Sequence, residues 1–193
     1  MVGTDIIDIE ETKRTTHWQR PRFLEKLFTP QERRYIEDSN DAFSMVWQLW
    51  SMKESAYKLY TQLYPSRFYN PKQFECMLNA SHGNVVYKTF GCIVKTKKTK
   101  QYILSEARLN HHKISSKIII FENTNRKTQS EATRVMLVKQ VSKQFGYTSN
   151  VSVKTSKLGV PLIYHNSEPL QLSVAISHHG HYGTFAISEL KPC

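Results

Sequence analysis

The chain contains the sequence Trp50-Ser51-Met52-Lys53-Glu54-Ser55-Ala56-Tyr57-Lys58, inside a run from 41 to 60 that has neither glycine nor proline. A run of this composition predicts a helix, on which residues three and four apart share a face. The spacing places Trp47, Trp50, Glu54 and Lys58 on one stripe, with Lys53 to the side. Two tryptophans followed by a carboxylate and an ammonium are an unusual stripe, because an unpaired buried charge is costly.

Glu54 and Lys58 allow two interpretations. A simple ion pair at this spacing on a half-exposed helix contributes only about 0.2–0.5 kcal/mol. The other interpretation is a functional site, and it gains support from a second acidic segment at the start of the chain. Residues 2–9 read as a strand that carries Asp5 and Asp8, whose side chains point to opposite faces because side chains alternate along a strand.

Composition describes a folded protein. The 193 residues are 39% hydrophobic and 11% aromatic, which suits one large domain or two small lobes. Three cysteines without metal-ligand spacing argue against a disulfide framework. No segment approaches the roughly 20 apolar residues of a membrane span, and the N-terminus does not resemble a signal peptide. We therefore expect a cytoplasmic protein with reduced thiols that does not bind a membrane.

The net charge of +11 predicts an acidic partner, and part of it lies in the cluster Lys95-Thr-Lys97-Lys98-Thr-Lys100. Nucleic acid, an anionic surface, an acidic protein or a phosphorylated ligand would all fit such a charge. The cluster is equally typical of a solvated strand edge protected by lysines.

Two capping-box patterns mark helix starts, at Thr29-Pro30-Gln31-Glu32 and at Thr128-Gln-Ser-Glu131, and the second helix is expected to close at Gly146. Strand patterns follow the first long helix at 74–78, 85–90 and 92–109. They surround the second helix at 117–121, 151–154, 161–164, 170–177 and 182–188. This order predicts an α+β fold with two similar lobes, a pseudo-dimer, in which each lobe is a long helix packed on a small antiparallel sheet. The lobes are expected at 1–112 and 113–193.

Asp5 and Glu54 are candidate oxygen ligands for Mg²⁺, which takes one or two carboxylates together with water and phosphate oxygens. Lys53 and Lys58 suit such a site, because an ammonium offsets phosphate charge. Ser177 and His178 end an apolar strand just before a glycine turn, where binding groups often gather. The residues thus predict a site between two lobes that handles a metal ion and phosphate.

Three blocks of the sequence resemble the signature elements of the 4′-phosphopantetheinyl transferases. They are Gly3-Thr4-Asp5-Ile6, the stretch from Trp50 to Lys58, and Ile176-Ser177-His178. The first block, and Arg22-Phe-Leu-Glu-Lys-Leu-Phe-Thr-Pro-Gln-Glu32 after it, resemble the holo-acyl-carrier-protein synthase branch. The second block resembles the surfactin-type branch. Leu158-Gly159-Val160-Pro161 is similar to the turn that precedes the Ser-His element in both branches.

This resemblance implies a reaction. Phosphopantetheine would pass from coenzyme A to a serine of an acidic acyl or peptidyl carrier protein, as in fatty acid biosynthesis, leaving 3′,5′-ADP. Asp5 and Glu54 would hold Mg²⁺, and Glu54 or a metal-bound water would be the base. Lys58, with Lys53, would neutralise phosphate oxygens, while Ser177 and His178 would bind the nucleotide end. One chain would supply both sides of the cleft, so a monomer is expected.

Two features depart from the family pattern. The usual Gly-Lys-Pro turn is Gly159-Val160-Pro161 here, and Arg134, Lys154 or Lys157 could replace the missing lysine. The segment Asp8-Ile9-Glu10 resembles the Asp-Ile-Glu triplet of the surfactin-type enzymes, so Asp8 and Glu10 are alternative metal ligands, although we favour Asp5.

The order of the two halves is also unusual. In the surfactin-type enzymes the half with the Ser-His element comes first, whereas here the half with Asp5 and Glu54 leads. The chain therefore resembles a circular permutation of that fold, or a one-chain fusion of the shorter trimeric type. Either arrangement predicts that the strand at 182–188 ends close to Gly3.

Two other functions are compatible with the charge. A basic nucleic-acid-binding module would use the lysine cluster and the tyrosines, but it leaves Asp5 and Glu54 without a role, so no nucleic acid is expected. A non-catalytic binder of coenzyme A or a carrier protein is the other alternative, and Val160 is its best support.

Overall fold

The computed structural model describes residues 1–65, 70–79, 82–109 and 113–190. The first half contains β1 (Val2–Asp8), α1 (Ile9–Thr15), α2 (Phe23–Leu27), α3 (Pro30–Glu37), α4 (Ala42–Leu63), the 3₁₀ turn η1 (Pro71–Gln73), β2 (Glu75–Leu78), β3 (Gly83–Tyr87), β4 (Phe90–Lys98) and β5 (Tyr102–Arg108). The second half contains β6 (Ser115–Ile120), α5 (Arg126–Phe145), β7 (Val151–Thr155), β8 (Pro161–His165), β9 (Glu168–Pro169), β10 (Leu172–His179) and β11 (Tyr182–Glu189). The predicted α+β class is confirmed.

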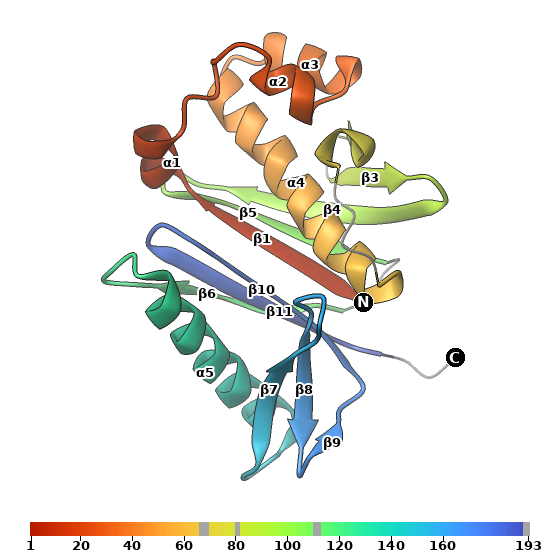
Figure 1. Ribbon diagram of the computed structural model, residues 1–193, viewed down its shortest axis with the longest axis vertical. Helices are drawn as coiled ribbons and strands as arrows, with labels where there is room; N and C mark the ends of the chain where they lie inside the picture. Colours follow the sequence, from red (N-terminus) through yellow and green to blue (C-terminus); the bar gives the residue numbers. More distant parts are fainter. Residues whose placement is uncertain (66–69, 80–81, 110–112, 191–193) are drawn as a thin grey trace.

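The first half is a five-stranded antiparallel sheet, in the order β1-β5-β4-β3-β2, covered on one face by α4 (Figure 1). The core lies between them and includes Trp47, Leu49, Met52, Ala56, Phe74, Val94 and Ile103. Helix α4 packs tightly on β1, because a Cβ atom at Gly3 would lie 1.9 Å from the Ser55 carbonyl oxygen. Only glycine permits this approach, which brings the stripe of α4 directly onto β1.

The second half contains a three-stranded sheet in the order β10-β11-β6 and a smaller one in the order β7-β8-β9. Helix α5 buries Gln129, Thr133, Leu137 and Val141, which recur every four residues and therefore share one face. The apolar members of this face meet Ile163, Val174, Phe185 and Ile187 in a second core. Both halves are a long helix on antiparallel sheet, and their equivalence as two lobes of a pseudo-dimer stays a prediction.

The helix starts show how local chemistry sets the boundaries. The capping box at Thr29 and Glu32 is confirmed, and it opens α3. The predicted start at Thr128 is wrong, because Asn125 is the N-cap and its side-chain oxygen accepts the N–H groups of Lys127 and Thr128. The predicted end is confirmed, since Gly146 follows α5 with a φ of 74° in the left-handed region.

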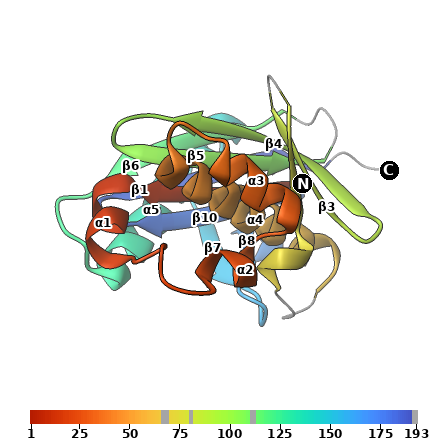
Figure 2. The same cartoon turned by 90° about the horizontal axis from the view of Figure 1, so that it is seen from above.

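The two halves meet where β1 runs alongside β10, with the helices on the outer sides (Figures 1 and 2). β1 is an edge strand of its sheet. Three of its N–H groups donate hydrogen bonds to side chains of β10. The N–H groups of Val2, Ile6 and Asp8 donate to Ser173 Oγ, Ser177 Oγ and His179 Nδ1 at 2.8, 3.4 and 3.0 Å. Side chains thus satisfy an edge that would otherwise need another strand.

This junction tests the expected closeness of 182–188 to Gly3. Ser188 of β11 pairs with Ser173, and the Ser173 hydroxyl accepts the N–H of Val2. The strand therefore ends beside the start of β1, as expected. The permuted order itself stays a prediction, and so does the boundary at 112, which lies outside the described residues.

The lysine cluster occupies the end of β4. Lys95, Lys97 and Lys98 are exposed, and they follow Val94, at which the pairing with β3 ends. This part of β4 is hydrogen-bonded to β5 on one side, so the lysines lie along a local sheet edge. None of the helices in the described parts of the chain is long and apolar enough to cross a membrane.

Candidate active site

Asp5 is the centre of the candidate site. It lies on β1 with 6% of its surface exposed, and its Oδ1 atom accepts from Lys58 Nζ at 2.9 Å and from Ser177 Oγ at 2.8 Å. The other oxygen, Oδ2, is buried and has no hydrogen-bond partner in the described parts of the chain. A buried carboxylate oxygen without a donor is costly, so this atom is suited to a cation or to a ligand group.

Lys58 brings positive charge to the same point from α4. Its ammonium also donates to the Thr4 carbonyl oxygen at 3.0 Å, and its side chain is 28% exposed. An ammonium has three N–H donors. Two of the three are directed at Thr4 and Asp5, and the partial exposure leaves the lysine accessible to an anion.

Glu54 lies on the helix stripe that faces Asp5. Ser51 donates to the Asp5 carbonyl oxygen at 3.3 Å, and Lys58 contacts the Asp5 carboxylate. Glu54 is three residues after Ser51 and four before Lys58, so it shares their face of α4. It is half-buried. Helical spacing therefore puts Glu54 on the face of α4 whose neighbours Ser51 and Lys58 contact Asp5.

His178 stands on β10, beside Ser177. Burial lowers the pKa of His178, and the positive charges of Lys58 and Arg126 lower it further. The imidazole is therefore neutral at pH 7 and offers one donor and one acceptor. Arg126 was missed by the sequence analysis because the helix start was set at Thr128. An N-cap assigned to Asn125 would have placed Arg126 in the first turn of α5.

Lys53 does not join this cluster, which corrects the expectation that it contacts phosphate. Its side chain is 0% exposed and pairs with Glu32 Oε1 at 2.7 Å. The ammonium also donates to the carbonyl oxygens of Pro71 and Phe74 at 2.9 and 2.6 Å. Lys53 therefore belongs to the core of the first half, where all three of its donors are used.

Asp8 and Glu10 are poorly suited to hold a metal ion. Asp8 Oδ1 accepts the Glu11 N–H at 3.1 Å, and Oδ2 accepts the His181 N–H at 2.8 Å. Glu10 is exposed and pairs with Lys13 at 3.1 Å. The described residues contain no group of three or more His, Cys, Asp or Glu side chains that could hold a metal ion. Mg²⁺ needs only one or two carboxylates when phosphate supplies the other oxygens, and Asp5 Oδ2 fits that need.

Arg134 lies away from Asp5. Its guanidinium donates to Thr155 Oγ1 of β7 at 2.9 Å, so it braces α5 against the small sheet. Lys154 lies over the Tyr164 ring, with Nζ 4.4 Å from the ring centroid. Of the proposed replacements for the missing lysine, Lys157 is the one that lines a cavity next to the site.

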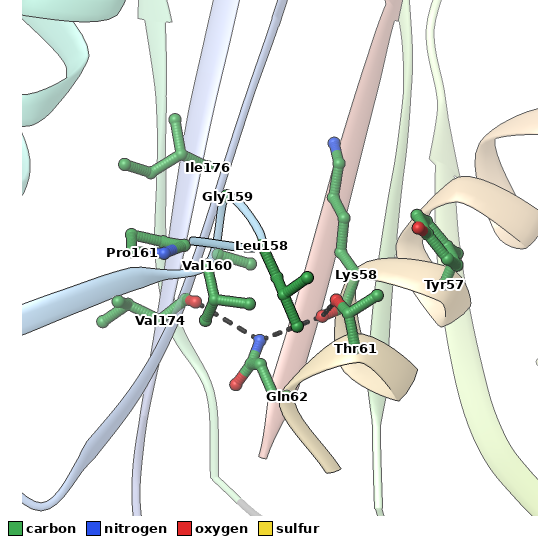
Figure 3. Close-up of a pocket in the computed structure, with 11 residues that line it drawn as sticks. Tyr57, Lys58, Thr61, Gln62, Leu158, Gly159, Val160, Pro161, Val174 and Ile176 are labelled. Atoms are coloured by element: carbon green, nitrogen blue, oxygen red, sulfur yellow. Dashed lines mark hydrogen bonds between the residues drawn. The ribbon is translucent and has the colours of Figure 1, made fainter. Parts of the chain in front are cut away.

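A cleft of about 140 Å³ adjoins Lys58 (Figure 3). It is lined by Tyr57, Lys58, Thr61 and Gln62 of α4, by the turn 158–161, and by Val174, Ala175 and Ile176 of β10. A second, mainly apolar cavity of about 350 Å³ shares Thr61, Gln62, Leu158, Val160, Pro161 and Val174 with it. The turn that contains Val160 in place of lysine is therefore one wall of this two-part cleft.

Gln62 joins the two halves at the cleft and was also missed from the sequence. Its side-chain nitrogen lies within hydrogen-bonding distance of three carbonyl oxygens, of Val2 at 2.7 Å, Lys58 at 3.2 Å and Val174 at 3.3 Å. Figure 3 shows the contacts with Lys58 and Val174. These contacts connect β1, α4 and β10. No short motif marks such a residue, because its partners are backbone carbonyls of segments far apart in the sequence.

Comparison with known proteins identifies relatives of the first half. Residues 1–116 match a family model described as the 4′-phosphopantetheinyl transferase superfamily. A holo-[acyl-carrier-protein] synthase of Caldanaerobacter subterraneus subsp. tengcongensis is 36% identical over 58 residues. That match covers 30% of this chain and 45% of the relative, so it spans less than half of the relative's length. Ser177 and His178 lie outside the residues that match the family model.

Proposed function

Because the chain belongs to the 4′-phosphopantetheinyl transferase superfamily, we propose that it transfers 4′-phosphopantetheine from coenzyme A to a serine of an apo carrier protein. The observation that carries the proposal is Asp5, whose buried Oδ2 has no donor among the described residues and whose Oδ1 contacts Lys58 beside a cleft. A cation and a polyanion together would satisfy this arrangement. The relative named holo-[acyl-carrier-protein] synthase supports a holo-acyl-carrier-protein synthase type of activity.

Asp5 and Glu54 are the proposed holders of Mg²⁺. Asp5 offers the buried Oδ2 atom, and Glu54 lies on the helix stripe that contacts Asp5 through Ser51 and Lys58. Bound there, Mg²⁺ would offset the negative charge of the coenzyme A pyrophosphate. Both carboxylates come from the half of the chain that matches the family.

Lys58 and Ser177 have different roles in the proposed site. Lys58 would donate an N–H to a phosphate oxygen and offset charge on the leaving 3′,5′-ADP. Ser177 was expected to bind the nucleotide, but its hydroxyl donates to Asp5 and accepts the Ile6 N–H. Ser177 therefore orients Asp5, and the neutral imidazole of His178 is the group of β10 that we propose contacts the nucleotide.

The transfer is a displacement at phosphorus. The carrier serine oxygen forms a bond to the phosphorus of phosphopantetheine, and the bond from that phosphorus to the 3′,5′-ADP oxygen breaks. Glu54 is the proposed base that takes the serine proton. The remaining contribution of the chain is positioning, because Asp5 of β1 is hydrogen-bonded to Lys58 of α4 and to Ser177 of β10, and Lys58 lines the cleft.

The partners follow from charge and architecture. The net charge of +11 suits both a polyanionic donor and an acidic carrier protein, and opposite charge accelerates their encounter. One chain supplies α4 and β10, the two sides of the cleft, so we propose that the protein acts as a monomer. The apolar cavity next to the cleft suits the less polar arm of coenzyme A.

The test uses the purified full chain with an apo acyl carrier protein, coenzyme A and Mg²⁺, and the mass of the carrier is measured. We expect the carrier to gain one phosphopantetheine group, and the gain should disappear in EDTA and return with Mg²⁺. Glu54→Gln should slow the gain by about 100-fold or more. Glu37→Gln, an exposed glutamate of α3, is the matched control.

Two results would contradict the proposal. One is an unchanged carrier mass at equimolar enzyme, even if coenzyme A binds, because that result identifies a non-catalytic binder. The other is a Glu54→Gln rate equal to that of the Glu37→Gln control, since the transfer would then not depend on the proposed site.

A further inference from the structure

Asp8 connects three segments of the chain. Its Oδ1 atom caps α1 through the Glu11 N–H, and its Oδ2 atom accepts the His181 N–H at 2.8 Å. Its own N–H donates to His179 Nδ1 at 3.0 Å, and its carbonyl oxygen accepts from the Thr12 hydroxyl at 2.6 Å. Asp8 is 3% exposed. The end of β1, the start of α1 and the turn between β10 and β11 are therefore joined at one buried residue.

The turn between β10 and β11 is shaped around this carboxylate. Gly180 has a φ of 56°, in the left-handed region, and a Cβ atom there would lie 2.2 Å from Asp8 Oδ2. On its other side the Gly180 carbonyl oxygen accepts from the Gln129 side-chain amide at 2.6 Å. Gln129 is 2% exposed and also donates to the Asn123 carbonyl oxygen at 2.7 Å. The turn is thus held by Asp8 from one half and by α5 from the other.

His178 lies between two anchors. Immediately before it, Ser177 is hydrogen-bonded to Asp5 and to the Ile6 N–H. Immediately after it, His179 accepts the Asp8 N–H. Both anchors attach β10 to the strand that carries Asp5. The Asp8 carboxylate adds a third contact at His181, and its loss would loosen the turn that follows His178 while the backbone bond to His179 remains.

We propose that Asp8 is a positioning residue, whose Oδ2 atom holds the β10–β11 turn at His181 and whose N–H holds His179, so that His178 keeps its place at the end of β10 next to Ser177. The proposal rests on the function proposed above for the meaning of His178 as a substrate contact. It assigns to Asp8 a role distinct from metal binding. Both carboxylate oxygens already accept backbone N–H groups: Oδ1 caps α1 through Glu11, and Oδ2 anchors the β10–β11 turn through His181.

The main test compares Asp8→Asn with Asp38→Asn, an exposed aspartate at the end of α3. In Asp8→Asn the new side-chain amide would present an N–H₂ group to one of the two backbone N–H donors, so one contact is lost with little change of volume. We expect the KM for coenzyme A to rise about tenfold, while kcat and the Mg²⁺ concentration for half-maximal rate stay within about twofold. The ¹H and ¹⁵N imidazole signals of His178 and His179 should shift in Asp8→Asn and stay in place in Asp38→Asn.

Gly180→Ala is the second variant, because its methyl group displaces the carboxylate while Asp8 itself is unchanged. It should raise the KM for coenzyme A in the same direction, and it keeps the proposal testable if Asp8→Asn does not fold. A raised Mg²⁺ requirement with an unchanged KM in Asp8→Asn would overturn the proposal and identify a metal ligand. Imidazole signals and a KM equal to those of Asp38→Asn would also overturn it.

The two proposals fail in different ways. If the parent chain adds no phosphopantetheine to any carrier, the proposed function is wrong. The imidazole signals still decide whether Asp8 positions His178, because that measurement needs neither coenzyme A nor turnover.

Discussion

Two lysines of helix α4 each pair with a carboxylate of another element, and the surroundings of the two pairs differ. In the Lys53–Glu32 pair, both side chains are 0% exposed, and the lysine also donates to two carbonyl oxygens. Glu32 Oε1 further accepts the Cys76 N–H at 2.6 Å, and Oε2 accepts the Thr29 N–H at 2.8 Å. Every charged atom of this pair has a protein partner, so the pair has no capacity left for a ligand.

In the Lys58–Asp5 pair, one charged atom lacks a protein partner among the described residues. Asp5 Oδ2 is buried without a donor among the described residues, and Lys58 is 28% exposed at a cleft. The two pairs have the same chemistry, and their lysines lie on the same helix. The difference therefore separates a pair whose charges are satisfied within the protein from a pair that keeps an unfilled contact at Asp5 Oδ2.

Asp5→Asn should have the largest effect, and it acts on activity. Asparagine keeps an Oδ1 acceptor for Lys58 and Ser177 but removes the charge at Oδ2, so carrier modification should slow by about 10³-fold. The free energy of unfolding should change by less than about 1 kcal/mol, because the contacts at Oδ1 remain. Steady-state rates and urea unfolding measure the two quantities.

Asp38→Asn serves as the control for Asp5→Asn, because it removes the same charge from an exposed position. A large loss of stability in Asp5→Asn would break the comparison. It would show that the Lys58–Asp5 pair is structural, like the pair at Lys53.

Glu32→Gln should have the next largest effect, and it acts on stability. It leaves the Lys53 ammonium buried without its counter-charge. It also turns the new NH₂ group toward the N–H of Cys76 or of Thr29, which then loses its acceptor. We expect the free energy of unfolding to fall by about 3 kcal/mol. Urea unfolding measures this loss, and Glu37→Gln in the same helix is the control.

The fraction of Glu32→Gln that remains folded should keep its kcat within about twofold, since Lys53 does not reach the cleft. A loss of kcat in fully folded Glu32→Gln would show that the Lys53–Glu32 pair contributes to catalysis.

The sequence was sufficient for the long helix and for the α+β class. A helix of 22 residues follows from a run without glycine or proline, and the positions of Glu54 and Lys58 follow from helical periodicity. The N-cap residues Thr29 and Asn125 act locally. The first was recognised, and the second was missed because a capping-box pattern three residues later competed with it.

The sequence could not decide which lysine faces the cleft. Lys53 and Lys58 both stand near Glu54, and local periodicity gives each a plausible role. Lys53 is kept from the cleft by its ion pair with Glu32. Glu32 already had a role in the capping box with Thr29, so no pattern in the sequence indicated that it also pairs with Lys53. The same limit applies to Ser177, because its bond to Asp5 joins residues 172 positions apart.

The smallest expected effect is a dependence of the free energy of unfolding on pH. It arises from His178 and His179, which lie near the Lys58–Asp5 pair. Burial lowers the pKa of His179, against the raising effect of Asp5, Asp8 and Glu11, and burial with the charges of Lys58 and Arg126 lowers the pKa of His178. Unfolding returns both to their ordinary value of 6.5, so the unfolded chain binds more protons in acid. The stability that depends on neutral imidazoles is therefore fully present above this pH. It should fall as the pH drops through 6.5 toward the lower folded-state pKa values.

Urea unfolding at several pH values between about 8 and 5 measures this loss. His179→Asn should flatten the acid side of the profile, because asparagine can accept the Asp8 N–H without titrating. His17→Asn, at an exposed position of the first half, should leave the slope as it is. A slope that is unchanged by His179→Asn would exclude His179 as the source of the acid sensitivity and leave His178 as the titrating neighbour of Lys58.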